Sequence, residues 1–225
     1  MENDRRSYTG IFVALAMIFV PCLVVSNLIA GKLWEIIPGI AVPASAILFP
    51  VTYILSDVFT EVYGFERTRL VIWLGFLCNF IAVVAYVITI LLPYPKYWYE
   101  QEAFAVVLGM TPRFLIASLA AYLLGEFSNS ITLSKLKVKN KGEHLWSRLI
   151  ISTVIGEALD SVIFILIAFV GVLPARQLFM MIIFQYVIKL IFEVVCSPLT
   201  IRFIGYIKKK DEIDTYDYEQ KYKFF

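Results

Sequence analysis

Two acidic residues, Glu157 and Asp160, lie within an apolar run that extends from Leu149 to Val172. Residues three apart share one face of a helix, so their two carboxylates point in the same direction. An ionised carboxylate that faces hydrocarbon is so unfavourable that a polar site lined by protein is the default interpretation. The spacing therefore predicts a polar site inside a bundle of helices.

A near copy of this pattern lies thirty-one residues earlier in the chain. Both copies read Gly-Glu-x-x-(Asn/Asp)-Ser, and the first contributes Glu126 and Asn129. Two interpretations are open for Glu126 and Glu157. They belong to the polar site, or they mark a close contact between two adjacent helices that run in opposite directions.

Composition places the chain in a membrane. Of its 225 residues 60% are hydrophobic and 17% are charged, and the mean hydropathy is +0.79. A soluble domain of this size cannot bury so much apolar surface. The net charge of +2 gives no reason to expect nucleic acid as a partner. The sequence therefore predicts an integral membrane protein.

Residues for catalysis or metal binding are scarce. The single histidine, His144, lies in a basic loop, and the three cysteines fall in apolar runs without the spacing of a metal site. No glycine-rich phosphate loop is found. We therefore expect no cofactor and no enzyme activity, although paired carboxylates acting as acid and base remain the rival hypothesis. Uptake of a small polar solute fits better.

The hydropathy pattern predicts an all-α membrane protein with six transmembrane helices. Pro43 and Pro50 make the second span irregular, and Pro112 interrupts the fourth. Residues 1–9 form the N-terminus, 10–206 the transmembrane domain and 207–225 a polar tail, with a loop at 31–39. The expected spans are 10–30, 40–62, 70–92, 103–133, 149–172 and 178–206.

Basic residues predict the orientation. With the N-terminus inside, inner segments hold twelve Lys and Arg residues and outer loops hold three. Because positive charge is retained on the cytoplasmic side, both termini are predicted to be cytoplasmic. The basic segments are interpreted as topology signals with a weak attraction for anionic lipid. The inner residues are Arg5, Arg6, Arg67, Arg69, Lys135, Lys137, Lys139, Lys141, Arg148 and Lys208 to Lys210, and the outer ones are Lys32, Lys96 and Arg176.

Several polar residues fall at similar depths. A helix rises about 1.5 Å per residue, so depth follows from the distance to the end of a span. Asp160, Lys189 and Arg113 lie near the middle of three different spans, with Glu157 close by and Asn27 further out. Such residues must converge on the interior of the bundle.

The sixth span carries a polar stripe at i, i+4 spacing that includes Lys189 and Glu193. Nearer the cytoplasm lie the second-span acids Asp57 and Glu61, with Glu126 and Asn129 from the fourth span. We expect substrate contacts from Asn27, Arg113, Glu157, Asp160, Lys189 and Glu193. We expect Asp57, Glu61, Glu126 and Asn129 to line the pathway or to carry a coupling proton.

Purely structural roles remain open for these residues. Lys189 can pair with Glu193 on its own helix or with Asp160 on the next one. Asp57 and Glu61 can pair with Arg67 or Arg69. Arg113 can donate to carbonyls freed at the Pro112 break, and Asn27 can join two helices by a hydrogen bond.

Several stretches of this sequence resemble those of a known protein family. The stretch at 56–64 (Ser-Asp-Val-Phe-Thr-Glu-Val-Tyr-Gly), Asn27, both Gly-Glu motifs and the tail at 214–218 (Asp-Thr-Tyr-Asp-Tyr) resemble the queuosine precursor transporters, a bacterial vitamin-uptake-like group with six spans. The resemblance covers nearly the whole chain. The tail departs from the family at 219–223, which is more highly charged.

The resemblance implies a multi-pass inner-membrane protein that imports a 7-deazaguanine: the 7-cyano or 7-aminomethyl precursor, or queuine, for tRNA modification. It also implies that Asn27, Asp57, Asp160 and Lys189 are pocket or pathway residues. The fold would resemble the substrate-binding components of energy-coupling-factor transporters. The alternative function is such a component, which needs a separate ATPase module. The sequence does not decide which deazaguanine is preferred or what energy drives transport. It also leaves the oligomeric state open, and a homodimer is one of the alternatives.

The chemistry of the substrate agrees with this interpretation. A guanine-type edge presents two donors that one carboxylate, such as Asp160 or Glu157, can accept, while a lysine or arginine donates to the ring carbonyl. Aromatic side chains stack on the ring faces, and Phe164 and Tyr186 lie on suitable spans. An aminomethyl substituent would favour a second acid such as Glu193.

Overall fold

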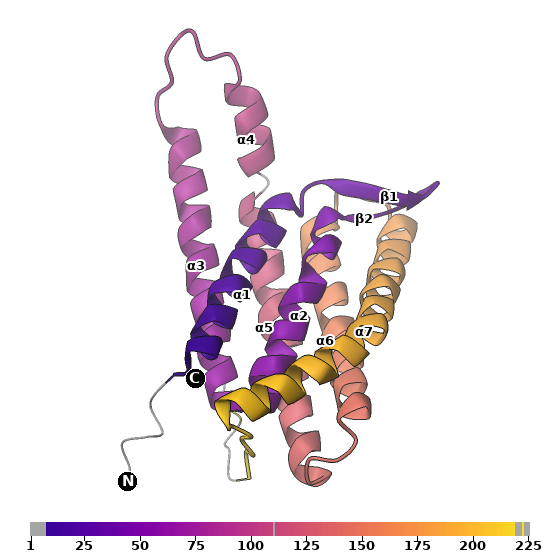
Figure 1. Cartoon of the computed structure of the whole chain (residues 1–225). Coiled ribbons are helices and arrows are strands. Elements are labelled where there is room, and N and C mark those ends of the chain that lie inside the picture. The colour runs from indigo at the N-terminus through magenta and orange to yellow at the C-terminus, as the bar shows by residue number, and fades with distance from the viewer. Residues whose placement is uncertain (1–7, 110, 219–221, 223–225) are drawn as a thin grey trace.

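The computed structural model describes residues 8–109, 111–218 and 222, which form a bundle of helices with a small β-hairpin (Figure 1). The start of α1 (Gly10–Ile29) and the end of α7 (Ala175–Asp211) lie at the same end of the bundle, which we call the termini side. The hairpin lies at the opposite end, the hairpin side. The side chains discussed below are placed relative to these two ends.

Five helical segments are long and apolar enough to cross a membrane. Each contains an 18-residue window of high mean hydropathy, and exposed Leu, Ile, Val and Phe side chains cover their outer faces. This is the pattern expected of helices that contact lipid. The spanning helices are α1 (Gly10–Ile29), α3 (Phe65–Leu91), α4 (Gln101–Gly109) followed by α5 (Thr111–Lys139), α6 (Leu145–Phe169) and α7 (Ala175–Asp211).

The second predicted span is not one continuous helix. Its first residues pair as β2 with β1 in the hairpin, so the second span does not begin as a helix at Ile40, although the bundle as a whole is the all-α membrane bundle that the sequence predicts. Pro43 and Pro50 explain this, because proline lacks the amide hydrogen that a helix interior requires. The elements in order are β1 (Leu33–Ile37), β2 (Ile40–Pro43), the 3₁₀ turn η2 (Ala44–Ile47), α2 (Phe49–Val58) and the π-helical turn η3 (Phe59–Tyr63).

The short helix α2 lies inside the bundle, where α1, α5 and α7 pack against it (Figure 1). Eight of its ten residues are buried. Interrupted backbone is tolerated at membrane depth only where protein surrounds it, which this location provides. The broken segment therefore places its polar side chains at the centre of the molecule.

Helix α7 is longer than a bilayer requires. Its 37 residues correspond to about 55 Å, against a hydrocarbon thickness of about 30 Å. Pro198 interrupts the backbone ladder, and the hydroxyl of Ser197 donates to the carbonyl of Val194, four residues before the proline. The last part of α7 crosses beneath the other helices on the termini side (Figure 1).

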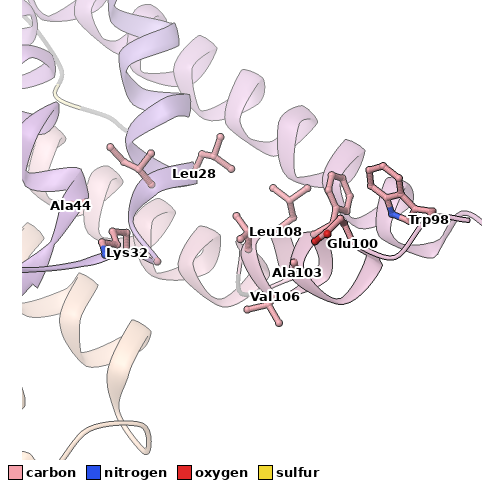
Figure 2. Close-up of a pocket in the computed structure, with 12 residues that line it drawn as sticks. Leu28, Lys32, Ala44, Trp98, Glu100, Ala103, Val106 and Leu108 are labelled. Carbon is pink, nitrogen blue, oxygen red and sulfur yellow. The ribbon is translucent and has the colours of Figure 1, made fainter. Parts of the chain in front are cut away.

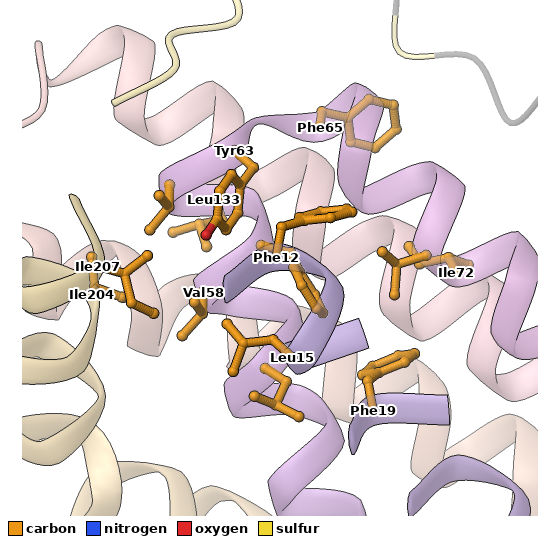
Figure 3. Close-up of a cluster of buried hydrophobic side chains, with 14 of the residues drawn as sticks. Phe12, Leu15, Phe19, Val58, Tyr63, Phe65, Ile72, Leu133, Ile204 and Ile207 are labelled. Atoms are coloured by element: carbon orange, nitrogen blue, oxygen red, sulfur yellow. The ribbon is translucent and has the colours of Figure 1, made fainter. Parts of the chain in front are cut away.

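Two apolar clusters stabilise the two ends of the bundle. On the termini side, α1, the α2–η3 segment and the end of α7 bring together Phe12, Val58, Tyr63 and Ile204 (Figure 3). On the hairpin side, Phe114, Phe164 and other residues of α5, α6 and α7 form the second cluster. The polar residues of the predicted site lie between these clusters.

Candidate functional site

Helices α5 and α6 are in close contact where the two Gly-Glu motifs meet. A Cβ atom added to Gly125 would lie 2.9 Å from the carbonyl oxygen of Gly156 and 2.9 Å from Cβ of Asp160. A Cβ atom added to Gly156 would lie 2.9 Å from the carbonyl oxygen of Gly125. Only glycine allows backbones to approach this closely. The repeat therefore marks a helix crossing, and it also fixes where Asp160 projects.

The ammonium group of Lys189 lies between two carboxylates of α6. Lys189 Nζ donates to Oδ2 of Asp160 and lies 2.8 Å from Oε2 of Glu157. The three residues are 2–3% exposed. Two carboxylates against one ammonium leave an excess negative charge in a buried place, which favours a ligand that brings hydrogen-bond donors or positive charge.

Two rings of the broken second segment cover this ammonium group. Lys189 Nζ lies 4.7 Å from the ring centroid of Phe49 and 5.4 Å from that of Tyr53. No described contact joins Lys189 to the ring of Phe164 or of Tyr186. Phe164 lies in the hairpin-side apolar cluster, with its ring centroid 6.4 Å from that of Phe114. Phe49 and Tyr53 lie on the inward stripe that the sequence predicts for the second span, and both are buried, but which charged group their rings cover does not follow from spacing in an irregular helix.

A second polar group lies toward the termini side. Asn129 Nδ2 donates to Oδ1 of Asp57 at 2.7 Å, and the carboxylate of Glu193 is close enough for its charge to act on Asp57. Glu126 interacts electrostatically with Glu157 and Asp160. Within the described part of the chain, Oδ2 of Asp57 and Oε1 of Glu193 have no hydrogen-bond partner.

Asn27 and Arg113 do not join the Lys189 group through any described hydrogen bond or ion pair. Asn27 is buried near the hairpin-side end of α1, and its amide atoms find no partner among the described residues. Arg113 is exposed, and its guanidinium donates to the carbonyls of Ile167, at 2.8 Å, and of Val170. It thus caps the C-terminal end of α6. Its predicted depth was near that of Asp160, but its side chain points elsewhere.

Glu61 belongs to a separate ion network on the termini side. Its carboxylate is fully buried and accepts two hydrogen bonds from Arg148, at 3.0 and 3.2 Å. Lys208 donates to it at 2.7 Å, and Lys137 Nζ lies 3.7 Å away. Lys137, Arg148 and Lys208 were interpreted only as topology signals. They also pair with this buried acid, and they explain why α5 and α7 extend beyond the predicted ends of their spans.

The C-terminal tail completes this network. Lys137 and Lys208 both contact the carboxylate of Asp214, at 2.5 and 2.9 Å. Partial burial raises the pKa of Asp214, but the hydrogen bonds and charges of the two lysines outweigh this effect and hold the pKa below its ordinary value. The tail is therefore held by charge against the ends of α5 and α7.

The tail also pairs with the η3 turn. The amide of Thr215 donates to the carbonyl of Val62 at 3.0 Å, and the carboxylate of Asp217 accepts from the amide of Phe65 at 3.0 Å. Gly64, at φ 85°, leaves room for Thr215, whose Cγ2 would lie 2.7 Å from an added Cβ. The two most distinctive stretches of the sequence, 56–64 and 214–218, are thus in contact.

Two hollows open on the hairpin side. The larger, about 980 Å³, lies between the end of α1 and the α4 region, and apart from Lys32 and Glu100 its lining residues are apolar (Figure 2). Such a lining suits hydrocarbon better than a polar ring. The smaller, about 540 Å³, lies between the β-hairpin and the start of α7 and contains Glu35, Arg176 and Met181. Met181 lies eight residues before Lys189 on the same face of α7.

Comparisons with known proteins give one family and one curated relative. Residues 43–203 match the family model described as "Putative vitamin uptake transporter". A protein of Bacillus subtilis (strain 168) named "Probable queuosine precursor transporter" is 25% identical over 178 residues, which cover 78% of this chain and 76% of the relative. No solved structure matches the chain, so the expected likeness to energy-coupling-factor components stays a prediction. The matched residues include α2, both Gly-Glu motifs and Lys189, and the chain belongs to the vitamin uptake transporter family.

Proposed function

We propose that this protein imports queuosine precursors, and that the group around Lys189 binds a 7-deazaguanine ring. The family is one of uptake transporters, and the Bacillus subtilis relative carries the name of a queuosine precursor transporter. The observation that carries the proposal is the buried Lys189, held between Asp160 and Glu157 on one side and the rings of Phe49 and Tyr53 on the other.

The hydrogen-bonding pattern of the base matches this group. A carboxylate accepts both donors of the guanine-type edge, and a lysine donates to the ring carbonyl. When the base binds, it replaces the contact between Lys189 and one carboxylate, so no buried charge loses its partner. Phe49 and Tyr53 offer faces on which a flat ring can stack. An aminomethyl group would find a further carboxylate in Glu193, four residues along α7.

The two sides of the site differ in access. On the hairpin side, the hollow of about 540 Å³ ends at Met181, which is followed on the same face of α7 by the buried residues Gln185 and Lys189. On the termini side, the Glu61 network, the tail and the apolar cluster around Phe12 close the bundle. The basic residues on the termini side indicate that it faces the cytoplasm. With this orientation, the proposed site is closed toward the cytoplasm.

Uptake of labelled 7-aminomethyl-7-deazaguanine tests the proposal in bacterial cells that lack both synthesis of the precursor and their own transporter. The wild-type chain should restore uptake. Asp160→Asn should abolish it because it removes a carboxylate that accepts the donors of the base, and Lys189→Ala should abolish it because it leaves two buried carboxylates without their cation. Glu102→Gln, which removes an exposed carboxylate from α4, is the matched control. Normal uptake by both site variants would remove the Lys189 group from the mechanism.

Reconstitution separates this function from its alternative. Purified protein in liposomes should transport the base without other subunits. A strict requirement for an ATP-hydrolysing module would instead identify the chain as the substrate-binding component of a larger importer.

A further inference from the structure

We propose that Asp57 and Glu193 form a proton-binding site that couples import of the base to the proton gradient. The inference rests on the proposed function and adds the coupling ion to it. It follows from three features of the residues adjoining the Lys189 group: their layered arrangement, their charge and their missing hydrogen-bond donors.

The proposed proton site lies one helix turn from the substrate site. Asp57 follows Tyr53 by four residues on α2, and Glu193 follows Lys189 by four on α7. Asn129 follows Gly125 by four on α5, and the hydrogen bond from Asn129 to Asp57 joins two of these helices. Residues four apart lie on the same helix face, so these side chains form one layer directly on the termini side of Lys189.

No ion pair joins Asp57 or Glu193 to a cation among the residues that the structure describes. The charge of Lys189 is already shared by Asp160 and Glu157. Asp57 is fully buried, and the charged groups acting on it are Glu193 from α7, Glu126 from α5 and Glu61 from its own segment. The remaining helix that packs against α2 is α1, which carries no charged residue.

Glu193, like Asp57, is a buried acid with other acidic groups close by. Glu157 from α6 and Asp57 from α2 act on it, and Lys189 and Cys196 are its neighbours on α7. Several buried carboxylates this close together cannot all remain ionised. At least one of the two acids must therefore carry a proton while the site is closed.

The unpartnered atoms of this layer are all acceptors short of a donor. Oδ2 of Asp57, Oε1 of Glu193 and Oδ1 of Asn129 are buried without a hydrogen-bond partner in the described structure. A proton on either carboxyl supplies the O–H that such acceptors require.

This location suits coupling. The layer lies between the base and the Glu61 network, so whichever opening exposes the base to one side of the membrane also exposes the carboxyl group. A proton taken from water on the hairpin side forms the O–H bond. The same proton returns to water on the termini side after that side opens, which leaves the carboxylate ready for the next cycle.

Proteoliposomes with labelled 7-aminomethyl-7-deazaguanine and an internal pH dye test the inference. The wild-type protein should accumulate the base when the outside is made acidic, and uptake should acidify the lumen. Asp57→Asn and Glu193→Gln should each lower this accumulation at least tenfold while they retain exchange of internal for external base, because exchange needs no net proton movement. Asp57→Glu should keep part of the accumulation, and Glu102→Gln should keep all of it.

The outcomes separate the two proposals. If the wild-type protein transports no base in any condition, the proposed function fails. If it transports the base but the pH gradient has no effect, if a sodium gradient drives uptake instead, or if both variants still accumulate the base, the proton site is wrong. Retained exchange in the variants also shows that they are folded, so a loss of accumulation cannot result from misfolding.

Discussion

Gly125 and Gly156 face each other across the contact between α5 and α6, each at the position where a Cβ would lie 2.9 Å from the other's carbonyl oxygen. This crossing fixes the positions of Glu126, Glu157 and Asp160. Its geometry is therefore a condition for the whole site.

Gly125→Ala and Gly156→Ala should each destabilise the protein by about 1–3 kcal/mol, because the added methyl group forces the two helices apart. They should also weaken substrate binding, since Asp160 moves with α6. Thermal unfolding in detergent and ligand-induced thermal shift measure the two effects. Gly205→Ala is the control, because nothing lies within 4 Å of a Cβ added there. Equal unfolding temperatures for all three variants would contradict the tight crossing.

Tyr53→Ala should lower the affinity for the base by about tenfold to a hundredfold, since stacking of a base on an aromatic ring is worth about 1–3 kcal/mol. Tyr53→Phe keeps the ring and should bind nearly as well as the wild-type protein. Phe164→Leu is the matched control, because that ring packs in the hairpin-side cluster. A larger loss of affinity from Phe164→Leu than from Tyr53→Ala would move the stacking position away from α2.

Arg148→Ala should destabilise the protein by about 3–5 kcal/mol, because it breaks a buried pair and leaves Glu61 with fewer partners. The stability of Arg148→Lys should lie between those of the wild-type protein and Arg148→Ala, since lysine keeps the charge but cannot form the two parallel hydrogen bonds. Unfolding by denaturant, monitored through tryptophan fluorescence, measures these changes in stability. Lys139→Ala removes an exposed cation of α5 and should change little. An effect of Lys139→Ala as large as that of Arg148→Ala would indicate a general charge effect instead.

Arg113→Gln should lower the free energy of unfolding by about 1 kcal/mol, because the carbonyls at the end of α6 lose a charged donor. The unfolding temperature should fall slightly. Its affinity for the base should stay within about twofold of the wild type, since nothing described connects the guanidinium with the Lys189 group. Isothermal binding measurements test this. A large loss of affinity would restore Arg113 to the substrate site.

Docking of the tail should depend on pH through Asp214. Because the pKa of Asp214 is lower in the docked tail than in a free one, docking favours the ionised carboxylate. The stabilisation is therefore complete above about pH 4, the ordinary value, and weakens as the pH falls through the lower docked value.

Asp214→Asn should reproduce the low-pH state at neutral pH, with faster hydrogen exchange at the amide of Thr215, which donates to Val62. Mass spectrometry of tail peptides at pH 7 measures this exchange. Glu212→Gln removes an exposed charge from the same segment and should leave exchange unchanged. Slow exchange in Asp214→Asn would mean that backbone contacts alone hold the tail.

The sequence alone determined the class of the molecule and most of its spans, because hydropathy depends on composition within a window and not on distant contacts. It also determined that Asp160 and Lys189 belong to one depth, since the rise of a helix is fixed. It indicated a special role for the two Gly-Glu motifs without deciding whether they bind substrate or pack helices.

Tertiary structure decided what each side chain faces. Arg113 and Lys189 were predicted at similar depths, but Arg113 caps the end of α6 at Ile167 and Val170, whereas Lys189 contacts Asp160 seven residues before Ile167. Counting residues from a predicted span end did not give the depth of Arg113, because its span is interrupted between α4 and α5. Glu61 and Asp57 are four residues apart, yet they contact different partners across the π turn. The pairing of the tail with η3 joins residues about 150 positions apart in sequence, and no local pattern encodes a contact of that range.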